Sequence, residues 1–175
     1  LYKTLFGRAY RDLGWQLKES SLFGPLTDSS DMKGYREKRN DLQLTMTQIK
    51  QTCGNSKEPK FVYGHFMVPH APYIFDRSGN LKTLSEIRST DTLKRRQIFC
   101  EQVQFASAMI TELVTHIKQS NKKNTVIIVM GDHGYRNIYG KRGYMIFDNF
   151  NSVYFPDKDY TQHYPTMSPV NSFRL

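Results

Sequence analysis

Residues 125–134 have the sequence TVIIVMGDHG, and this stretch decides the fold class of the chain. Residues 125–130 are a short run of β-branched and apolar side chains, the strongest strand signal in the sequence. The apolar run stops at Gly131, so Asp132 and His133 follow the end of the strand directly. The stretch therefore predicts a strand that carries polar, chemically capable side chains at its carboxyl end.

A long amphipathic helix is expected upstream, over residues 91–119, with Asp91 serving at its N-terminus. Before it, residues 61–68 (FVYGHFMV) form a nearly continuous aromatic and β-branched run, which is typical of a buried strand. The order strand, helix, strand predicts a βαβ unit with parallel neighbours. Because parallel sheets bind ligands outside the carboxyl ends of their strands, a site is expected after Val68 and after Met130.

Three further segments complete the predicted architecture. Apolar positions among charges predict a helix over residues 33–52, and a short strand is expected at residues 151–155. Residues 1–17 could form a helix, which Gly7 and Gly14 weaken. The predicted fold class is α/β, with a mostly parallel, helix-flanked sheet.

Composition predicts one folded unit with a basic surface. A length of 175 residues suits a single domain, and 11 Tyr and 11 Phe supply large side chains for a core. The net charge of +9 suggests a phosphorylated or sulfated substrate, nucleic acid or an acidic membrane surface, or else a basic surface that is simply solvated. The basic clusters, residues 36–39 and 94–96, fall in predicted helices, so we expect no nucleic-acid partner.

The ends of the sequence and its cysteines bear on its context. The chain opens at Leu1 without an initiator Met, and it stops where Ser168 and Pro169 predict the start of a helix, so we expect a fragment of a longer protein. Cys53 and Cys100 permit at most one disulfide, and they do not identify the compartment.

Asp132 and His133 are the strongest candidates for a metal site. Adjacent residues on a regular strand point to opposite faces, so both can hold one ion only where the backbone leaves strand geometry. Gly131 and Gly134 permit that departure. A carboxylate and a neutral imidazole are usual ligands of zinc or manganese. The alternative is that Asp132 caps a turn while His133 makes a local hydrogen bond.

Three other side chains are candidates by position. His70 lies between Pro69 and Pro72, whose rigidity suits a pre-positioned donor to a transferring phosphoryl or sulfuryl group, or else simply ends the strand. Arg136 could contact an anionic substrate through its guanidinium fork, or be a solvated loop residue. His65 is expected to be buried and bonded to a backbone group, with a supporting role near the site left open.

Two stretches together resemble the second half of a sulfatase-type domain of the alkaline phosphatase superfamily: residues 61–80, FVYGHFMVPHAPYIFDRSGN, and residues 125–136, TVIIVMGDHGYR. The similarity is greatest to membrane-anchored bacterial proteins such as lipoteichoic-acid synthases and phosphoethanolamine transferases. It covers residues 59–175, whereas residues 1–58 form a helical leading segment that fits only by position. The resemblance implies an extracytoplasmic hydrolase or transferase that acts on phosphate or sulfate esters of lipid headgroups or glycans.

The resemblance also implies residue roles. Asp132 and His133 would hold a divalent ion, zinc or manganese before magnesium or calcium, and His70 would contact the transferred group. In the family, a Thr, Ser or modified Cys nucleophile and an acidic ligand come from the first half of the domain. No such motif precedes Asp132, so we expect this fragment itself to be inactive. The alternative is a non-catalytic binding module that keeps the fold.

Overall fold

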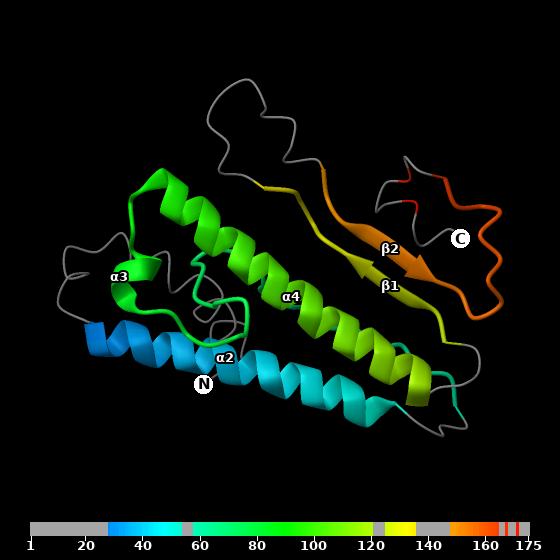
Figure 1. Cartoon of the computed structure of the whole chain (residues 1–175). Coiled ribbons are helices and arrows are strands. Elements are labelled where there is room, and N and C mark those ends of the chain that lie inside the picture. The colour runs from blue at the N-terminus through cyan, green and yellow to red at the C-terminus, as the bar shows by residue number, and fades with distance from the viewer. Residues whose placement is uncertain are drawn as a thin grey trace. The chain divides into compact units, whose positions relative to one another are not determined.

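The computed structural model describes residues 28–53, 58–120, 125–135 and 148–164, together with Met167 and Asn171. Its helices and strands, in chain order, are α2 (Asp28–Thr52), α3 (Leu84–Ile87), α4 (Thr92–Ser120), β1 (Ile127–Met130) and β2 (Asn151–Tyr154) (Figure 1). No helix among the described residues is both long enough and apolar enough to cross a membrane.

Both long helices expected from the sequence are confirmed. α2 begins at Asp28, earlier than the predicted residue 33, and ends at the predicted place. At the start of α4 the Asp91 carboxylate accepts the main-chain N–H of Lys94 at 2.6 Å, which satisfies one of the unpaired donors of the first turn. The helices expected over residues 1–17 and from Ser168 lie outside the described residues.

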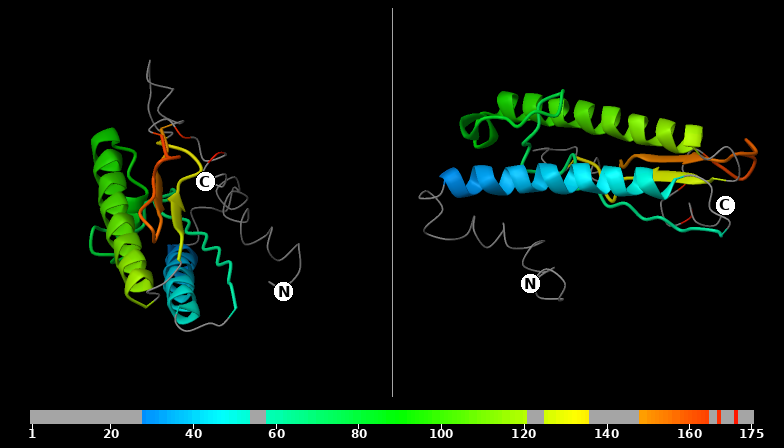
Figure 2. Two further views of the ribbon diagram at one scale, coloured as in Figure 1. Left: turned by 90° about the vertical axis from the view of Figure 1, so that its right-hand side faces the viewer. Right: turned by 90° about the horizontal axis from the view of Figure 1, so that it is seen from below.

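The two strands expected around the second apolar run and near residue 151 are also confirmed, but they pair with each other. β1 and β2 form a two-stranded antiparallel sheet, in which Ile127 is opposite Tyr154 and Met130 is opposite Asn151. They lie side by side in every view (Figures 1 and 2). The described residues show no parallel pairing, so the predicted βαβ unit and mostly parallel sheet are not found in this part of the chain.

Residues 61–68 are not the buried strand that their composition predicts. Exposure alternates over residues 63–68, where Tyr63, His65 and Met67 are exposed and the residue after each of them is half-buried. Alternation of this kind means that only one face is covered, and no described strand pairs with the segment. Phe61, the first residue of the segment, is 86% exposed. The predicted burial of His65 is wrong as well, and its ring stacks on Tyr63 instead, with ring centroids 6.4 Å apart.

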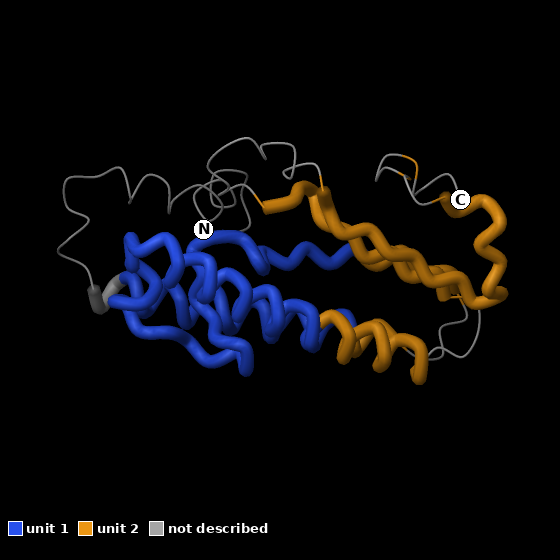
Figure 3. Tube along the Cα trace, turned by 45° about the horizontal axis from the view of Figure 1, so that its top comes forward, with its two compact units in different colours: residues 1–49, 63–109 blue, residues 50–62, 110–175 orange. Residues whose placement is uncertain are grey.

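The structure divides into two compact units (Figure 3). Unit 1 comprises residues 1–49 and 63–109, and unit 2 comprises residues 50–62 and 110–175. Unit 1 holds most of the deeply buried apolar side chains of the described residues, namely Leu42, Met46, Tyr73, Ile74, Phe75, Ile98, Ala106 and Met109. In unit 2 the corresponding side chain is Leu113. Both cysteines are thiols.

Candidate functional site

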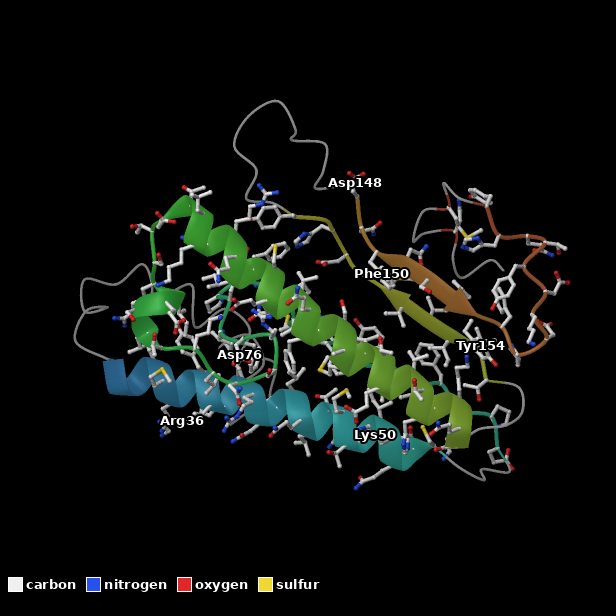
Figure 4. All side chains as sticks on the ribbon, viewed as in Figure 1. Arg36, Lys50, Asp76, Asp148, Phe150 and Tyr154 are labelled. Atoms are coloured by element: carbon white, nitrogen blue, oxygen red, sulfur yellow. The ribbon has the colours of Figure 1, made fainter. Side chains whose placement is uncertain are left out.

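The end of β1 is held by the segment that leads into β2, within unit 2. The Gly131 N–H donates to the carbonyl of Phe150 at 2.8 Å, and the side-chain amide of Asn149 donates to the carbonyl of Gly131 at 2.8 Å. Phe150 lies immediately before β2 (Figure 4). These two hydrogen bonds fix the backbone on the N-terminal side of Asp132, and their other partners lie in the segment just before β2.

Asp132 and His133 follow in a bend, where the backbone has left strand geometry. Nε2 of His133 lies 3.8 Å from Oδ2 of Asp132, so the two side chains lie on the same side of the chain. On a regular strand they would point to opposite faces. The Asp132 side chain is 89% exposed and that of His133 is 25% exposed, which leaves the pair accessible from solvent.

The ring of His133 has a defined orientation. Its Nδ1 lies 2.6 Å from the carbonyl oxygen of Gly134. A carbonyl can only accept, so Nδ1 carries the proton, and in the neutral ring the lone pair is on Nε2, the atom that faces Asp132. Histidines that bind metals almost always donate their other ring N–H to a carbonyl or a carboxylate, which fixes the tautomer. The orientation of His133 is compatible with metal binding through Nε2.

The pair fits one divalent ion without completing a site. Two ligands that each lie about 2.1 Å from a zinc ion can be at most about 4.2 Å apart, so the observed 3.8 Å is compatible with a shared ion. Catalytic zinc sites normally have three protein ligands. No group of three His, Cys, Asp or Glu side chains in the described ranges is placed to hold an ion. Further donors would have to come from elsewhere in the protein.

His70 lies in unit 1, in the loop that begins at Pro69, and its side chain is exposed. The Val68–Pro69 and Ala71–Pro72 peptide bonds are both cis. Nδ1 of His70 donates to the carbonyl of Ala71 at 2.5 Å, and the main-chain carbonyl of His70 accepts a hydrogen bond from the Gln102 side chain at 2.9 Å. The backbone of the loop is therefore bound to α4 while the ring faces outward.

The His70 loop continues into a tight turn over residues 76–80, which begins at Asp76 (Figure 4). The Asp76 carboxylate accepts the main-chain N–H groups of Ser78 and Asn80, each at 2.8 Å. Burial raises the pKa of Asp76, but the hydrogen bonds from Asn80 and Ser78 and the charge of Lys82 outweigh it and lower the pKa overall. The N–H of Lys82 closes the turn by donating to the carbonyl of Ile74 at 2.9 Å.

A partly buried ion pair joins this turn to α4. Lys82 is only 7% exposed and bonds to the carboxylate of Glu101, which also accepts from Gln97 at 3.2 Å. The hydrogen bond from Lys82 is the main cause that lowers the pKa of Glu101. Two adjacent residues of α4, Glu101 and Gln102, thus hold the segment that contains His70.

The structure brings Asp132 and His133 together, and it places His70 in the other unit. The approach of His70 to that pair stays a prediction, as does the metal assignment. Arg136 lies outside the described residues. Gln102 and Asn149 were not expected from the sequence, although a polar Gln102 on the buried face of α4, four residues after Ile98, is a signal that could have found the first of them.

The sulfatase family model matches residues 9–170, a region that includes both the His70 loop and the Asp132–His133 turn. This chain belongs to the sulfatase family. Sulfatases act on sulfate esters and typically use a divalent metal, so membership supports an α/β fold and the superfamily of sulfate- and phosphate-ester hydrolases. The match also takes in most of residues 1–58. No curated protein and no solved structure matches the chain.

Proposed function

We propose that this sulfatase-family chain is part of a metal-dependent hydrolase or transferase of phosphate or sulfate esters, in which Asp132 and His133 hold the divalent ion. The observation that carries the proposal is the paired geometry of these two residues. Their donor atoms are 3.8 Å apart, and the Gly134 carbonyl orients His133 so that Nε2 faces the carboxylate. A divalent ion bound there polarises ester oxygens and neutralises their negative charge.

His70 is assigned to the transferred group. Its Nδ1 donates to the carbonyl of Ala71, and Nε2 is the atom that we assign to the substrate. An N–H at Nε2 would donate to the oxygen on which negative charge develops. Arg136 is assigned to binding the anionic ester through two parallel N–H groups.

The remaining donors and the nucleophile are assigned to parts of the protein outside the described residues. The two donors found among the described residues are one short of the usual catalytic zinc set, so on their own they are expected to hold a metal weakly. Covalent catalysis by an activated hydroxyl, resolved by water or an acceptor alcohol, is the proposed reaction type.

The substrate class that we favour is a lipid-headgroup or glycan ester, handled by a membrane-anchored, extracytoplasmic bacterial protein of the lipoteichoic-acid synthase or phosphoethanolamine transferase type. The support is the resemblance of residues 61–80 and 125–136 to those proteins. The net charge of +9 agrees with an anionic substrate. Zinc and manganese are the favoured ions, because one ligand is an imidazole and the other a carboxylate.

The test is hydrolysis of 4-nitrophenyl sulfate and 4-nitrophenyl phosphate by the full-length protein, before and after chelation. Turnover of one ester should be lost on chelation and restored by zinc or manganese. Asp132→Asn should lower it by about 100-fold or more, since even residues that only orient metal ligands contribute about 10- to 100-fold.

Asp157→Asn is the matched control, because Asp157 is an exposed carboxylate of unit 2 that accepts the N–H of Asp159 at 3.0 Å. It should leave turnover unchanged. Turnover that is indifferent both to chelation and to Asp132→Asn would contradict the proposal. Metal-dependent binding of an ester without any turnover would favour the non-catalytic binding module instead.

A further inference from the structure

Gln102 is a fully buried amide in the middle of α4. Its exposed fraction is 0%, and the apolar side chains of Ile98 and Ala106, one turn before and one turn after it, are buried on the same face of the helix. An amide taken out of water is costly unless its donor and acceptor are both paired. Gln102 therefore stays at this place in the core only because its neighbours satisfy it.

Both ends of the amide bind the main chain of the His70 loop. Oε1 of Gln102 accepts the N–H of Phe75 at 3.1 Å, and Nε2 donates to the carbonyl of His70 at 2.9 Å. The two main-chain groups bracket the segment 70–75, so a single side chain of α4 fixes both ends of it. Phe75, at 2% exposure, is also held by ring contact with Phe105.

We infer that Gln102 is a positioning residue for His70. It fixes the backbone that carries the imidazole, and so it acts on the reaction through His70. The inference rests on the proposed role of His70. The ring has its own local bond to Ala71, so the placement of Nε2 follows the backbone at residues 70 and 71. Catalytic groups must be held within about 0.5 Å, and a displacement of about 1 Å can lower the rate on the order of 100-fold.

A merely structural Gln102 would behave differently in a double-mutant cycle. Gln102→Met keeps the length of the side chain and removes both hydrogen bonds. If Gln102 acts through His70, kcat falls on the order of 10- to 100-fold with little change in KM, and the same substitution does nothing further in a His70→Ala background. If Gln102 only stabilises the core, the melting temperature falls and any effect on kcat adds to that of His70→Ala.

The experiment measures kcat and KM for the metal-loaded full-length protein, its His70→Ala and Gln102→Met variants, and the double variant. Gln104→Met, an exposed glutamine on the same helix, is the control and should match the wild type. Thermal melts establish that each variant is folded at the assay temperature. Where Gln102→Met does not fold, Gln102→Glu replaces it, because the carboxylate still accepts from Phe75 but loses the N–H that binds the His70 carbonyl.

Loss of kcat in Gln102→Met that disappears in the His70→Ala background is the expected result. Additive losses, or a fall in melting temperature with unchanged kcat, would overturn the inference and leave the proposed function standing. An unchanged kcat in His70→Ala would overturn the assigned role of His70, and this inference with it. If the wild-type protein showed no turnover at all, the proposed function would be overturned, and this inference, which rests on it, would fall with it.

Discussion

The His70 loop and the Asp132–His133 turn both follow apolar runs, but they are held in different ways. A buried side chain, Gln102 of α4, binds the main chain of the His70 loop at two points. The Asp132–His133 turn is instead held from the neighbouring strand segment, by the main chain of Phe150 and the side chain of Asn149. The first loop belongs to a core, and the second to the end of a sheet.

Because the two regions are held differently, mutations in each should affect a different property. The segment after His70 contributes Tyr73, Ile74 and Phe75 to the core of unit 1, so changes there should reduce stability first. Asp132 is almost fully exposed, so changes around it should leave stability nearly intact and weaken metal binding first. Each prediction below tests one side of that contrast.

The largest effect is expected for Phe75→Ala. The ring is 2% exposed and lies 4.9 Å, between centroids, from that of Phe105. Its loss should lower the free energy of unfolding by about 3–5 kcal/mol, measured by urea denaturation. Phe61→Ala, which removes the same side chain at 86% exposure, should change the free energy of unfolding by less than about 0.5 kcal/mol. Equal effects of the two substitutions would refute the described core.

A glycine pair gives the next largest effect, with opposite signs. Gly79 has φ +83°, and a Cβ there would lie 2.5 Å from the Phe105 ring, so Gly79→Ala should destabilise by about 1–3 kcal/mol. Gly34 lies within α2 with open space around it, so Gly34→Ala should stabilise by about 0.5–1 kcal/mol. Thermal melts of both variants measure this, and destabilisation by Gly34→Ala would contradict the assigned helix.

In the Asp132–His133 turn, Asn149→Ala should weaken metal binding by about 10-fold, because it removes the hydrogen bond to the Gly131 carbonyl next to Asp132. The melting temperature should change little. Titration of zinc into both proteins measures the affinity. Ser152→Ala, at an exposed position of β2, is the control and should bind zinc as the wild type does. If Asn149→Ala lowered the melting temperature but left zinc affinity unchanged, Asn149 would stabilise the sheet and have no role at the metal site.

The smallest effect is the acid sensitivity of unit 1. The hydrogen bond from Lys82 lowers the pKa of Glu101 below its ordinary 4.5, as the hydrogen bond with Thr83 does for Glu86. A lowered folded pKa contributes stability that is fully present above the ordinary value and is lost as the pH falls through the lowered one. The melting temperature should therefore decline as the pH drops below 4.5, and Glu101→Gln should decline less steeply. An identical decline in both would mean that the ion pair contributes nothing.

The sequence predicted those parts of the fold whose signals are local. α4 follows from its own apolar spacing and its Asp91 cap, and β1 from six consecutive residues that end at a glycine. The turn after β1 was found because the apolar run stops where Asp132 and His133 begin. These inferences required no knowledge of what lies next to each segment.

What the sequence could not give depends on partners far along the chain. Residues 61–68 have the composition of a strand, but a strand forms only where another backbone pairs with it. The direction of the β1–β2 pairing is likewise set by contacts between segments rather than by either one alone. The bonds of Gln102 join residues 27 and 32 positions apart, so they are invisible to any local pattern.

The most direct test of the central claim is calorimetric titration of zinc and manganese into the full-length protein and two of its histidine variants. The account predicts that the wild type binds one ion per chain, that His133→Ala weakens binding by about 100-fold or more, and that His163→Ala binds as the wild type does. His163 is the matched control because it is an exposed histidine of unit 2. A wild-type protein that binds neither ion, or a His133→Ala variant that binds with unchanged affinity, would contradict the assignment of Asp132 and His133 as metal ligands.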